Sequence, residues 1–214
     1  MDPFSSKTHG HVVFLDLETT GLDPNKDRIL EIAMVVMATS DGVPKITERW
    51  SCVIGSIGDP ADTITDPCCL KMHDDNGLLK ECRASRVLLS DAERMAVDVL
   101  RSHGFVAKDA VIAGNSIHFD RQFVSRWMPD LHRFLSHRMI DVSALRELMT
   151  RVLGMGGAVS GVKASMGEPK HRALPDAEAS ILEVARLVDV VNGVGLRFVR
   201  GFAPAGFVGD PSGR

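Results

Sequence analysis

The segment HVVFLDLETTGL, residues 11–22, decides how the fold of this chain is interpreted. An apolar run leads into acidic residues, which is typical of a central buried strand that ends at a polar edge. Asp16 and Glu18 are two positions apart, so their side chains leave a strand on the same face. Open α/β sheets commonly place ligands at such strand ends. The segment therefore predicts a buried strand that carries two carboxylates to one edge of a sheet.

The two carboxylates admit two interpretations. Side by side they repel each other and resist ionisation, and a divalent cation would remove that cost. Hard oxygen ligands of this kind suit Mg²⁺ or Mn²⁺. Alternatively, Asp16 and Glu18 are solvated charges where a strand turns into a loop, since an Asp-x-Glu triplet is common. The pair alone does not decide between these two interpretations.

The rest of the chain alternates between strand and helix patterns. Apolar runs predict strands at residues 29–38, 48–54, 111–113 and 138–141, and helical periodicity covers residues 90–104, 119–127, 145–152 and 175–191. Ser90 and Glu93 form a capping-box pattern, whereas the Gly-rich residues 154–169 predict a mobile loop. This alternation predicts one α/β domain, with a mixed β-sheet flanked by helices.

The composition is that of an ordinary globular protein, with 44% hydrophobic and 25% charged residues. Its longest apolar runs fall far short of the roughly 18 residues of a membrane span, so we expect no membrane association. Residues 1–10 lack the apolar core of a signal peptide, and we expect them to be a flexible lead-in. A net charge of −3 argues against a long basic track for nucleic acid but allows a short, locally held ligand.

The four cysteines form no C-x-x-C pair and no grouping with zinc-finger spacing. They are interpreted as free thiols in a reducing cytosol rather than as redox or metal residues, so we expect a cytoplasmic protein.

Further acidic residues stand where elements are expected to begin. Asp120 follows the segment GNSIHF, between a predicted strand and a helix, and Asp176 lies five residues after His171 in HRALPD. Two-metal sites need several bridging and terminal carboxylates. A histidine beside such a site suits a general base, since its unperturbed pKa is about 6.5. The four acids and His171 could therefore converge on one site.

The order Asp-x-Glu, Asp, His-x4-Asp resembles that of the DEDDh 3′–5′ exonucleases, which have a ribonuclease-H-like fold. The resemblance is closest to the oligoribonucleases. It is carried in order by the blocks LDLETTGLDPNKDRILEIA, MHDDNGL, GNSIHFDRQF, HRMIDVSALREL and HRALPDAEASI. The resemblance covers most of the chain and implies an exonuclease domain over residues 11–191. It assigns no role to the tail, residues 192–214.

The resemblance implies the chemistry of the site. Asp16, Glu18, Asp120 and Asp176 would bind two divalent ions, Mg²⁺ or Mn²⁺, and His171 would activate the attacking water. Short single-stranded RNA, with dinucleotides favoured, would be cut from its 3′ end to nucleoside 5′-monophosphates. The five residues together would form the catalytic set.

The resemblance also implies a substrate pocket. Leu22 would act as an apolar wedge and His73 as a stacking partner for the bases, while Ser116, Arg138 and Ser143 would surround the 5′ phosphate. Arg138 would come from a partner subunit, so a homodimer is implied. Taken singly, each residue has a simpler interpretation, such as a turn residue at the edge of the core, a surface histidine, a helix-entry hydroxyl or an exposed charge.

The sequence departs from the family at His137, where oligoribonucleases usually have tyrosine; this chain contains no tyrosine. Histidine can still stack and donate a hydrogen bond. The block GNSIHFD also resembles ribonuclease T and the proofreading exonucleases. A broader exonuclease acting on single-stranded DNA or RNA 3′ ends therefore stays open. So does a binding module that does not cut, although idle clustered carboxylates argue against it.

Overall fold

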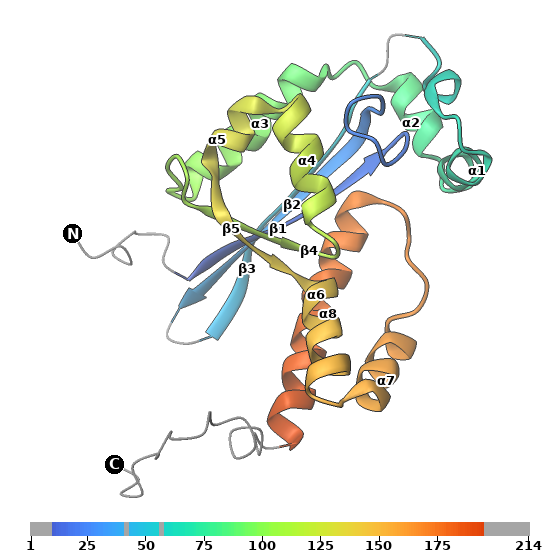
Figure 1. Ribbon diagram of the computed structural model, residues 1–214. Helices are drawn as coiled ribbons and strands as arrows, with labels where there is room; N and C mark the ends of the chain where they lie inside the picture. Colours follow the sequence, from blue (N-terminus) through green and yellow to red (C-terminus); the bar gives the residue numbers. More distant parts are fainter. Residues whose placement is uncertain (1–9, 41–42, 56–57, 195–214) are drawn as a thin grey trace, which may run out of the picture.

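A sheet of five strands in the order β3-β2-β1-β4-β5 forms the centre of the computed structural model (Figure 1). The structure describes residues 10–40, 43–55 and 58–194. Most of the expected lead-in and tail, residues 1–9 and 195–214, lies outside the described residues.

The sheet is mixed, as the sequence predicts. Its strands are β1 (His11–Thr19), β2 (Ile29–Ser40), β3 (Val43–Val53), β4 (Ala110–Gly114) and β5 (Leu135–Asp141). The first three pair antiparallel, whereas β4 runs parallel to β1 and β5 runs parallel to β4. The prediction of a single α/β domain with a ribonuclease-H-like sheet is confirmed.

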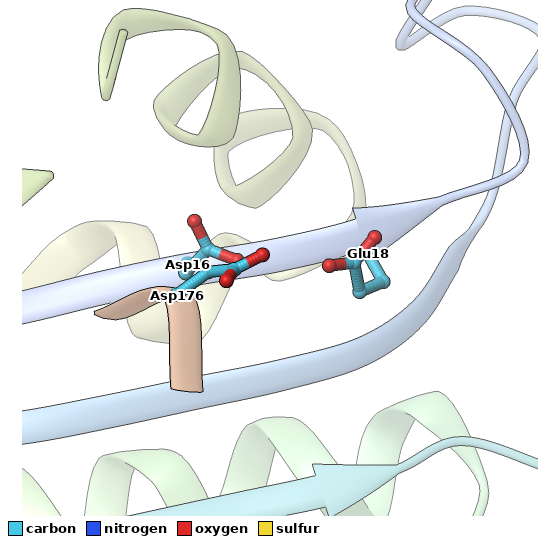
Figure 2. A group of neighbouring side chains, drawn as sticks. All are labelled: Asp16, Glu18 and Asp176. Atoms are coloured by element: carbon cyan, nitrogen blue, oxygen red, sulfur yellow. The ribbon is translucent and has the colours of Figure 1, made fainter. Parts of the chain in front are cut away.

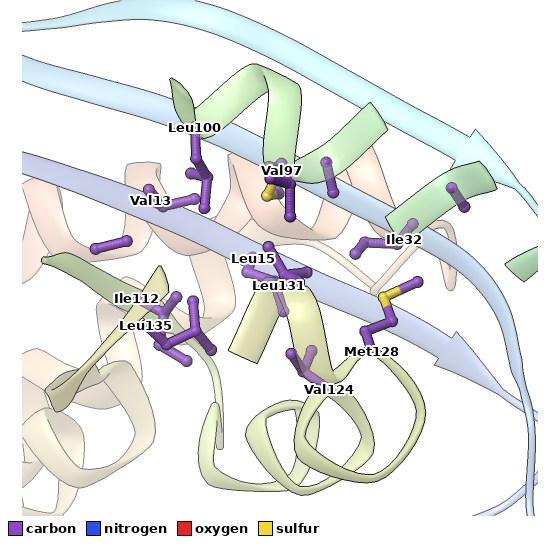
Figure 3. Packing of buried hydrophobic residues seen from close by; sticks show 14 of the residues in the cluster. Val13, Leu15, Ile32, Val97, Leu100, Ile112, Val124, Met128, Leu131 and Leu135 are labelled. Atoms are coloured by element: carbon purple, nitrogen blue, oxygen red, sulfur yellow. The ribbon is translucent and has the colours of Figure 1, made fainter. Parts of the chain in front are cut away.

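Helices cover both faces of this sheet (Figure 1). On one face lie α3 (Leu89–Ser102), α4 (His118–Trp127) and α5 (Pro129–Phe134), and on the other lies α8 (Ala173–Val194). Figure 3 shows Val13 and Leu15 of β1 in the first layer, packed among residues of α3, α4 and α5 such as Leu100 and Leu131. All four of these side chains are buried.

Strand β1 presents its other face to α8. Phe14 belongs to the buried cluster that includes Ala177 of α8, on the opposite side of the sheet from Val13 and Leu15. Because side chains alternate along a strand, Asp16 and Glu18 follow Phe14 onto the α8 face. The alternation that builds the two core layers therefore also sets the direction of the two acids.

Two smaller groups of helices complete the fold. The helices η1 (Pro60–Thr63), α1 (Pro67–Asp75) and α2 (Leu78–Ala84) pack around Leu30 at one end of the sheet. The helices α6 (Val142–Glu147), η2 (Leu148–Val152) and α7 (Gly156–Met166) pack against the outer half of α8. The sequence reasoning missed η1, α1 and α2.

The predicted capping box at the start of α3 is wrong. The helix begins at Leu89, so Ser90 lies inside it and caps nothing. The Glu93 side chain serves a different helix, because its Oε1 accepts hydrogen bonds from the N–H groups of Asp130 and Leu131 at the start of α5. The glutamate of this sequence motif thus forms a contact between α3 and α5 and does not cap the start of α3.

The predicted loop over residues 154–169 is also wrong in its main part. Helix α7 occupies residues 156–166 and buries Val159 and Val162 against α8. Glycine lowers intrinsic helix propensity, but burial of an apolar face overrides that preference here. None of the described helices combines the length and the apolar character that crossing a membrane requires.

Candidate metal centre

Three carboxylates meet where β1 passes the first turn of α8. Asp16 and Glu18 come from β1, and Asp176 comes from α8 (Figure 2). Each offers one oxygen, and these three oxygens all lie within 4.8 Å of one another. Residues 160 positions apart in sequence thus form one cluster, as the sequence predicts for Asp16, Glu18 and Asp176.

Both acids of β1 resist ionisation. Burial is the largest cause of the raised pKa of Asp16, followed by the negative charges of Asp120 and Glu18. Burial also leads in raising the pKa of Glu18 to about 8, with Asp176 and Glu31 adding to it. Within the described part of the chain, no Lys or Arg forms an ion pair with Asp16 or Glu18.

Asp120 lies beside this cluster on the first turn of α4. One carboxylate oxygen, Oδ1, accepts a hydrogen bond of 3.0 Å from the N–H of Leu17 in β1. Burial raises the pKa of Asp120 to about 7, although the backbone hydrogen bonds oppose that shift. The structure therefore brings the fourth predicted acid next to Asp16, but with one oxygen already bonded to the strand.

This donor set fits a divalent cation. Buried carboxylates that repel one another stay protonated unless a positive charge compensates them, and hard oxygen ligands suit Mg²⁺, Mn²⁺ or Ca²⁺. The raised pKa values of Asp16, Glu18 and Asp120 are the signature of such missing charge. The cluster therefore has both the ligands and the electrostatic need for a bound metal ion.

A fifth carboxylate, which is buried, lies directly across from Glu18. Glu31 of β2 is paired in register with Glu18 and is only 3% exposed. Unlike Glu18, it is fully engaged, because the Arg172 side chain donates to both of its oxygens. The sequence reasoning missed Glu31 and Arg172. The signal for Glu31 was a charge inside the apolar run ILEIAMVV, where a buried strand should carry none.

His171 lies just before α8 and is exposed. Its charge acts on His73 of α1, whose pKa is lowered mainly by burial and further by His171. The Nδ1 atom of His73 is 3.9 Å from Glu18 Oε2, while its Nε2 is bonded to the Thr19 carbonyl oxygen at 2.9 Å. His171 therefore acts on the histidine that lies next to Glu18, and its own role as a general base stays a prediction.

His73 itself is completely buried in this structure. An enclosed ring offers no free face to a nucleic-acid base, so its stacking role stays a prediction. Its Nδ1 atom, which faces Glu18, has no hydrogen-bond partner among the described residues.

The two serines predicted to bind phosphate do meet. Ser116 Oγ donates to Ser143 Oγ at 3.1 Å, and the Ser116 N–H donates to Oδ1 of Asp141 at 3.1 Å. The sequence reasoning missed Arg146, which donates from Nη2 to Ser143 Oγ at 2.9 Å and forms an ion pair with Glu183. The serine pair is thus hydrogen-bonded to a polar network that connects α6 with α8.

The other predicted substrate residues lie on the surface. Leu22 is 76% exposed in the loop after β1, which leaves its apolar side chain open to solvent. His137 and Arg138 are exposed on β5, which is an edge strand of the sheet. Their contacts with a substrate or a partner subunit stay predictions.

Sequence comparison gives the family. Residues 13–184 match the model of the family described as Exonuclease. The chain belongs to this exonuclease family. The resemblance to oligoribonucleases is also confirmed, because curated relatives of that name are similar over most of the chain. This assigns a 3′–5′ exonuclease domain to most of the described residues.

Three of these relatives illustrate the match. The oligoribonuclease of Mycobacterium avium (strain 104) is 37% identical over 181 residues, covering 81% of this chain and 77% of the relative. That of Rhodococcus jostii (strain RHA1) is 38% identical, covering 81% of this chain and 83% of the relative. That of Tropheryma whipplei (strain Twist) is 36% identical, covering 83% and 91%.

Solved structures are similar to this chain in fold. Escherichia coli Exonuclease I in complex with a dA16 oligonucleotide gives a TM-score of 0.58 at 16% identity, covering 85% of this chain. This chain spans only 41% of that Exonuclease I chain. Cell-death related nuclease 4 gives a TM-score of 0.60 at 12% identity, covering 85% of this chain and 64% of its own. At these identities the likeness supports the fold alone.

Proposed function

We propose that this protein is a metal-dependent 3′–5′ exoribonuclease that degrades short oligoribonucleotides, dinucleotides above all, to nucleoside 5′-monophosphates. The observation that carries the proposal is the cluster of Asp16, Glu18 and Asp176, with Asp120 beside it. Burial and mutual repulsion raise the pKa of Asp16 and Glu18, and burial raises that of Asp120, so these carboxylates need more positive charge than the protein gives them. Such a centre suits phosphodiester hydrolysis, and the curated relatives are named oligoribonucleases.

Two divalent ions, Mg²⁺ or Mn²⁺, would be held by Asp16, Glu18, Asp120 and Asp176. When bound, such ions supply Lewis-acid stabilisation of the charge that develops on the phosphate and on the leaving 3′ oxygen. His171 would take a proton from the attacking water, whose oxygen would form a bond to phosphorus as the bond between phosphorus and the 3′ oxygen breaks. The leaving 3′ oxygen would take up a proton from solvent and become a hydroxyl. His171 is exposed, and the N–H of the preceding residue, Lys170, donates to Asp176 Oδ1 at 3.0 Å; this contact of the segment with one of the acids supports the role.

The proposed pocket favours short substrates. Leu22, with most of its side chain exposed, would wedge against a base, with His73 nearby. Ser116 and Ser143, which meet at 3.1 Å, would donate to the 5′ phosphate. Contacts to a 5′ phosphate favour an oligonucleotide short enough to end inside the pocket. Such a substrate needs no long basic track on the protein, which agrees with the net charge of −3.

A homodimer would complete this pocket. Strand β5 is an edge strand, and its residues Met139 and Ile140 are 40% and 41% exposed. An exposed apolar edge strand is a liability unless another chain or element covers it. A second copy on this edge would bring its Arg138 and His137 toward the phosphate end of the pocket. We also propose a cytoplasmic location, which the four free cysteines support.

A broader exonuclease is the alternative, since the fold is similar to that of Exonuclease I, whose structure holds a dA16 oligonucleotide. A series of 5′-phosphorylated RNA and DNA oligomers from two nucleotides upward, assayed with Mn²⁺ and with chelator, separates the two. We expect the RNA dinucleotide to be cut fastest and chelator to stop all cutting. Equal rates on long DNA would favour the alternative, and binding without hydrolysis would favour a non-catalytic module.

A further inference from the structure

Arg172 connects three parts of the fold through four hydrogen bonds. Its Nε and Nη2 atoms donate to the two oxygens of Glu31 on β2, at 3.0 and 3.1 Å. Its Nη1 and Nη2 atoms donate to the two oxygens of Glu81 on α2, at 2.9 and 2.7 Å. The next residue, Ala173, donates its N–H to Glu31 Oε2 at 3.0 Å. We call Arg172, Glu31 and Glu81 the arginine clamp.

The residues on either side of the clamp are tethered as well. The Asn76 side chain at the end of α1 donates to the carbonyl oxygen of His171. The N–H of Lys170 donates to Asp176 Oδ1 at 3.0 Å. His171 has a φ of 51°, a left-handed conformation that costs a non-glycine residue about 1 kcal/mol or more. Such strain persists only where the surroundings enforce it, and here successive residues are bonded to different elements.

The clamp is placed relative to the carboxylate cluster by strand register. Glu31 is paired directly with Glu18, so a residue bonded to Glu31 has a set position beside the cluster. His73, which His171 influences, lies 3.9 Å from the same Glu18. Arg172, the residue after His171, is therefore anchored to Glu31, which is the residue paired with the proposed metal ligand Glu18.

We propose that Arg172 is a positioning residue that holds the general base His171 at the carboxylate cluster. The inference rests on the proposed role of His171. The planar guanidinium binds two carboxylates in a defined geometry, which a lysine ammonium does not reproduce. Because Glu81 is on α2 and Glu31 on β2, the clamp also fixes the start of α8 against both elements.

The first test compares Arg172→Met and Arg172→Lys with the wild-type chain on a labelled 5′-phosphorylated RNA dinucleotide at saturating Mn²⁺. We expect kcat to fall about 100-fold in Arg172→Met with little change in KM, in line with the loss of general-base catalysis. Arg172→Lys should recover part of that loss. A wild-type kcat in Arg172→Met overturns the proposal.

A double-mutant cycle separates positioning from general stability. If Arg172 acts through His171, the variant that combines His171→Ala with Arg172→Met should be no slower than His171→Ala alone in single-turnover assays. Effects that multiply overturn the positioning role. A His171→Ala variant with wild-type turnover would instead refute the proposed general base, so the two failures are distinguishable.

Glu81→Ala is the gentler variant, because Glu81 is half exposed and alanine is favourable in a helix. It removes the outer half of the clamp but leaves the pair with Glu31. We expect kcat to fall about twofold to fivefold at a nearly unchanged Tm, the usual size of the loss of one partly exposed ion pair. The matched control is Arg83→Ala on the same helix, which breaks an exposed pair with Asp59. Equal kcat values in the two variants would count against the clamp.

Discussion

Glu18 and Glu31 face each other across two neighbouring strands, yet their surroundings are opposite. Both are buried, at 7% and 3% exposed. Glu31 receives hydrogen bonds from Arg172 and from the Ala173 backbone. Among the described residues, Glu18 has the Nδ1 of His73 at 3.9 Å as its ion-pair partner, and the charge of Arg172 acts on it without a contact. The same residue type at paired positions thus has its charge balanced in one strand and only weakly compensated in the other.

The difference separates a structural carboxylate from a functional one. A buried carboxylate that is paired and hydrogen-bonded stays ionised. A buried carboxylate without such partners has a raised pKa, so it binds a proton unless a cation compensates its charge. The pKa of Glu18 is raised to about 8 by burial and by its acidic neighbours. We therefore interpret Glu31 as a glutamate that holds the fold, and Glu18 as the proposed metal ligand.

The largest expected effect comes from Glu18→Gln. Loss of one charged metal ligand should reduce kcat by about 1,000-fold or more, comparable to the removal of other groups that stabilise transition-state charge. Hydrolysis of the RNA dinucleotide at saturating Mn²⁺ measures it, and circular dichroism checks the fold. Glu31→Gln, which leaves the proposed ligands in place, should retain far more activity. If Glu31→Gln were the slower enzyme, the comparison would be reversed.

The stability of the metal-free protein should depend on pH in a defined direction. The folded pKa of Glu18 lies near 8, above its ordinary value of 4.5, so the folded state binds more protons between these values. The contribution of Glu18 to the free energy of unfolding is then fully present below about pH 4.5 and is lost as the pH rises through 8. Thermal melts in chelator should show Tm falling from pH 6 to pH 8. Added Mn²⁺ should reverse that fall, and Glu18→Gln should flatten it.

The smallest expected effect is on the free energy of unfolding. Two matched substitutions, at Glu31 and at Glu18, should change it in opposite directions. Glu31→Gln should destabilise the protein by about 1–3 kcal/mol, less than for a fully buried pair because Arg172 is partly exposed. Glu18→Gln should stabilise the metal-free protein at pH 8, since it removes an uncompensated charge. Urea unfolding of both variants in chelator measures the two changes. Shifts of the same sign would show that the two glutamates do not differ as described.

The sequence predicted those parts of the molecule that depend on local pattern. Alternation in residues 11–17 correctly indicates a buried strand, and with it the shared face of Asp16 and Glu18. The order of the acidic blocks indicates the cluster with Asp176, although that aspartate lies 158 positions after Glu18. In each case the information lies in a short segment whose periodicity sets the direction of its side chains.

What the sequence did not reveal depends on contacts between distant segments. The partners Glu31 and Arg172 are 141 positions apart, and neither segment carries a sign of the other. Glu93 lies in a capping-box pattern, but its side chain accepts hydrogen bonds from the start of α5. The glycines of residues 154–169 predict a loop, although packing stabilises a helix there. Tertiary partners that override local propensity cannot be read from one segment alone.

Strand β1 builds the core with one set of alternate residues and the proposed catalytic edge with the other. Leu15 and Leu17 face α3 and its neighbours, while Phe14, Asp16 and Glu18 face α8. A slip of one residue against β2 would turn leucines toward α8 and carboxylates into the apolar layer. A misaligned molecule would thus lose packing and ligands together. Specific activity after refolding should therefore report the fraction of chains in which β1 paired correctly.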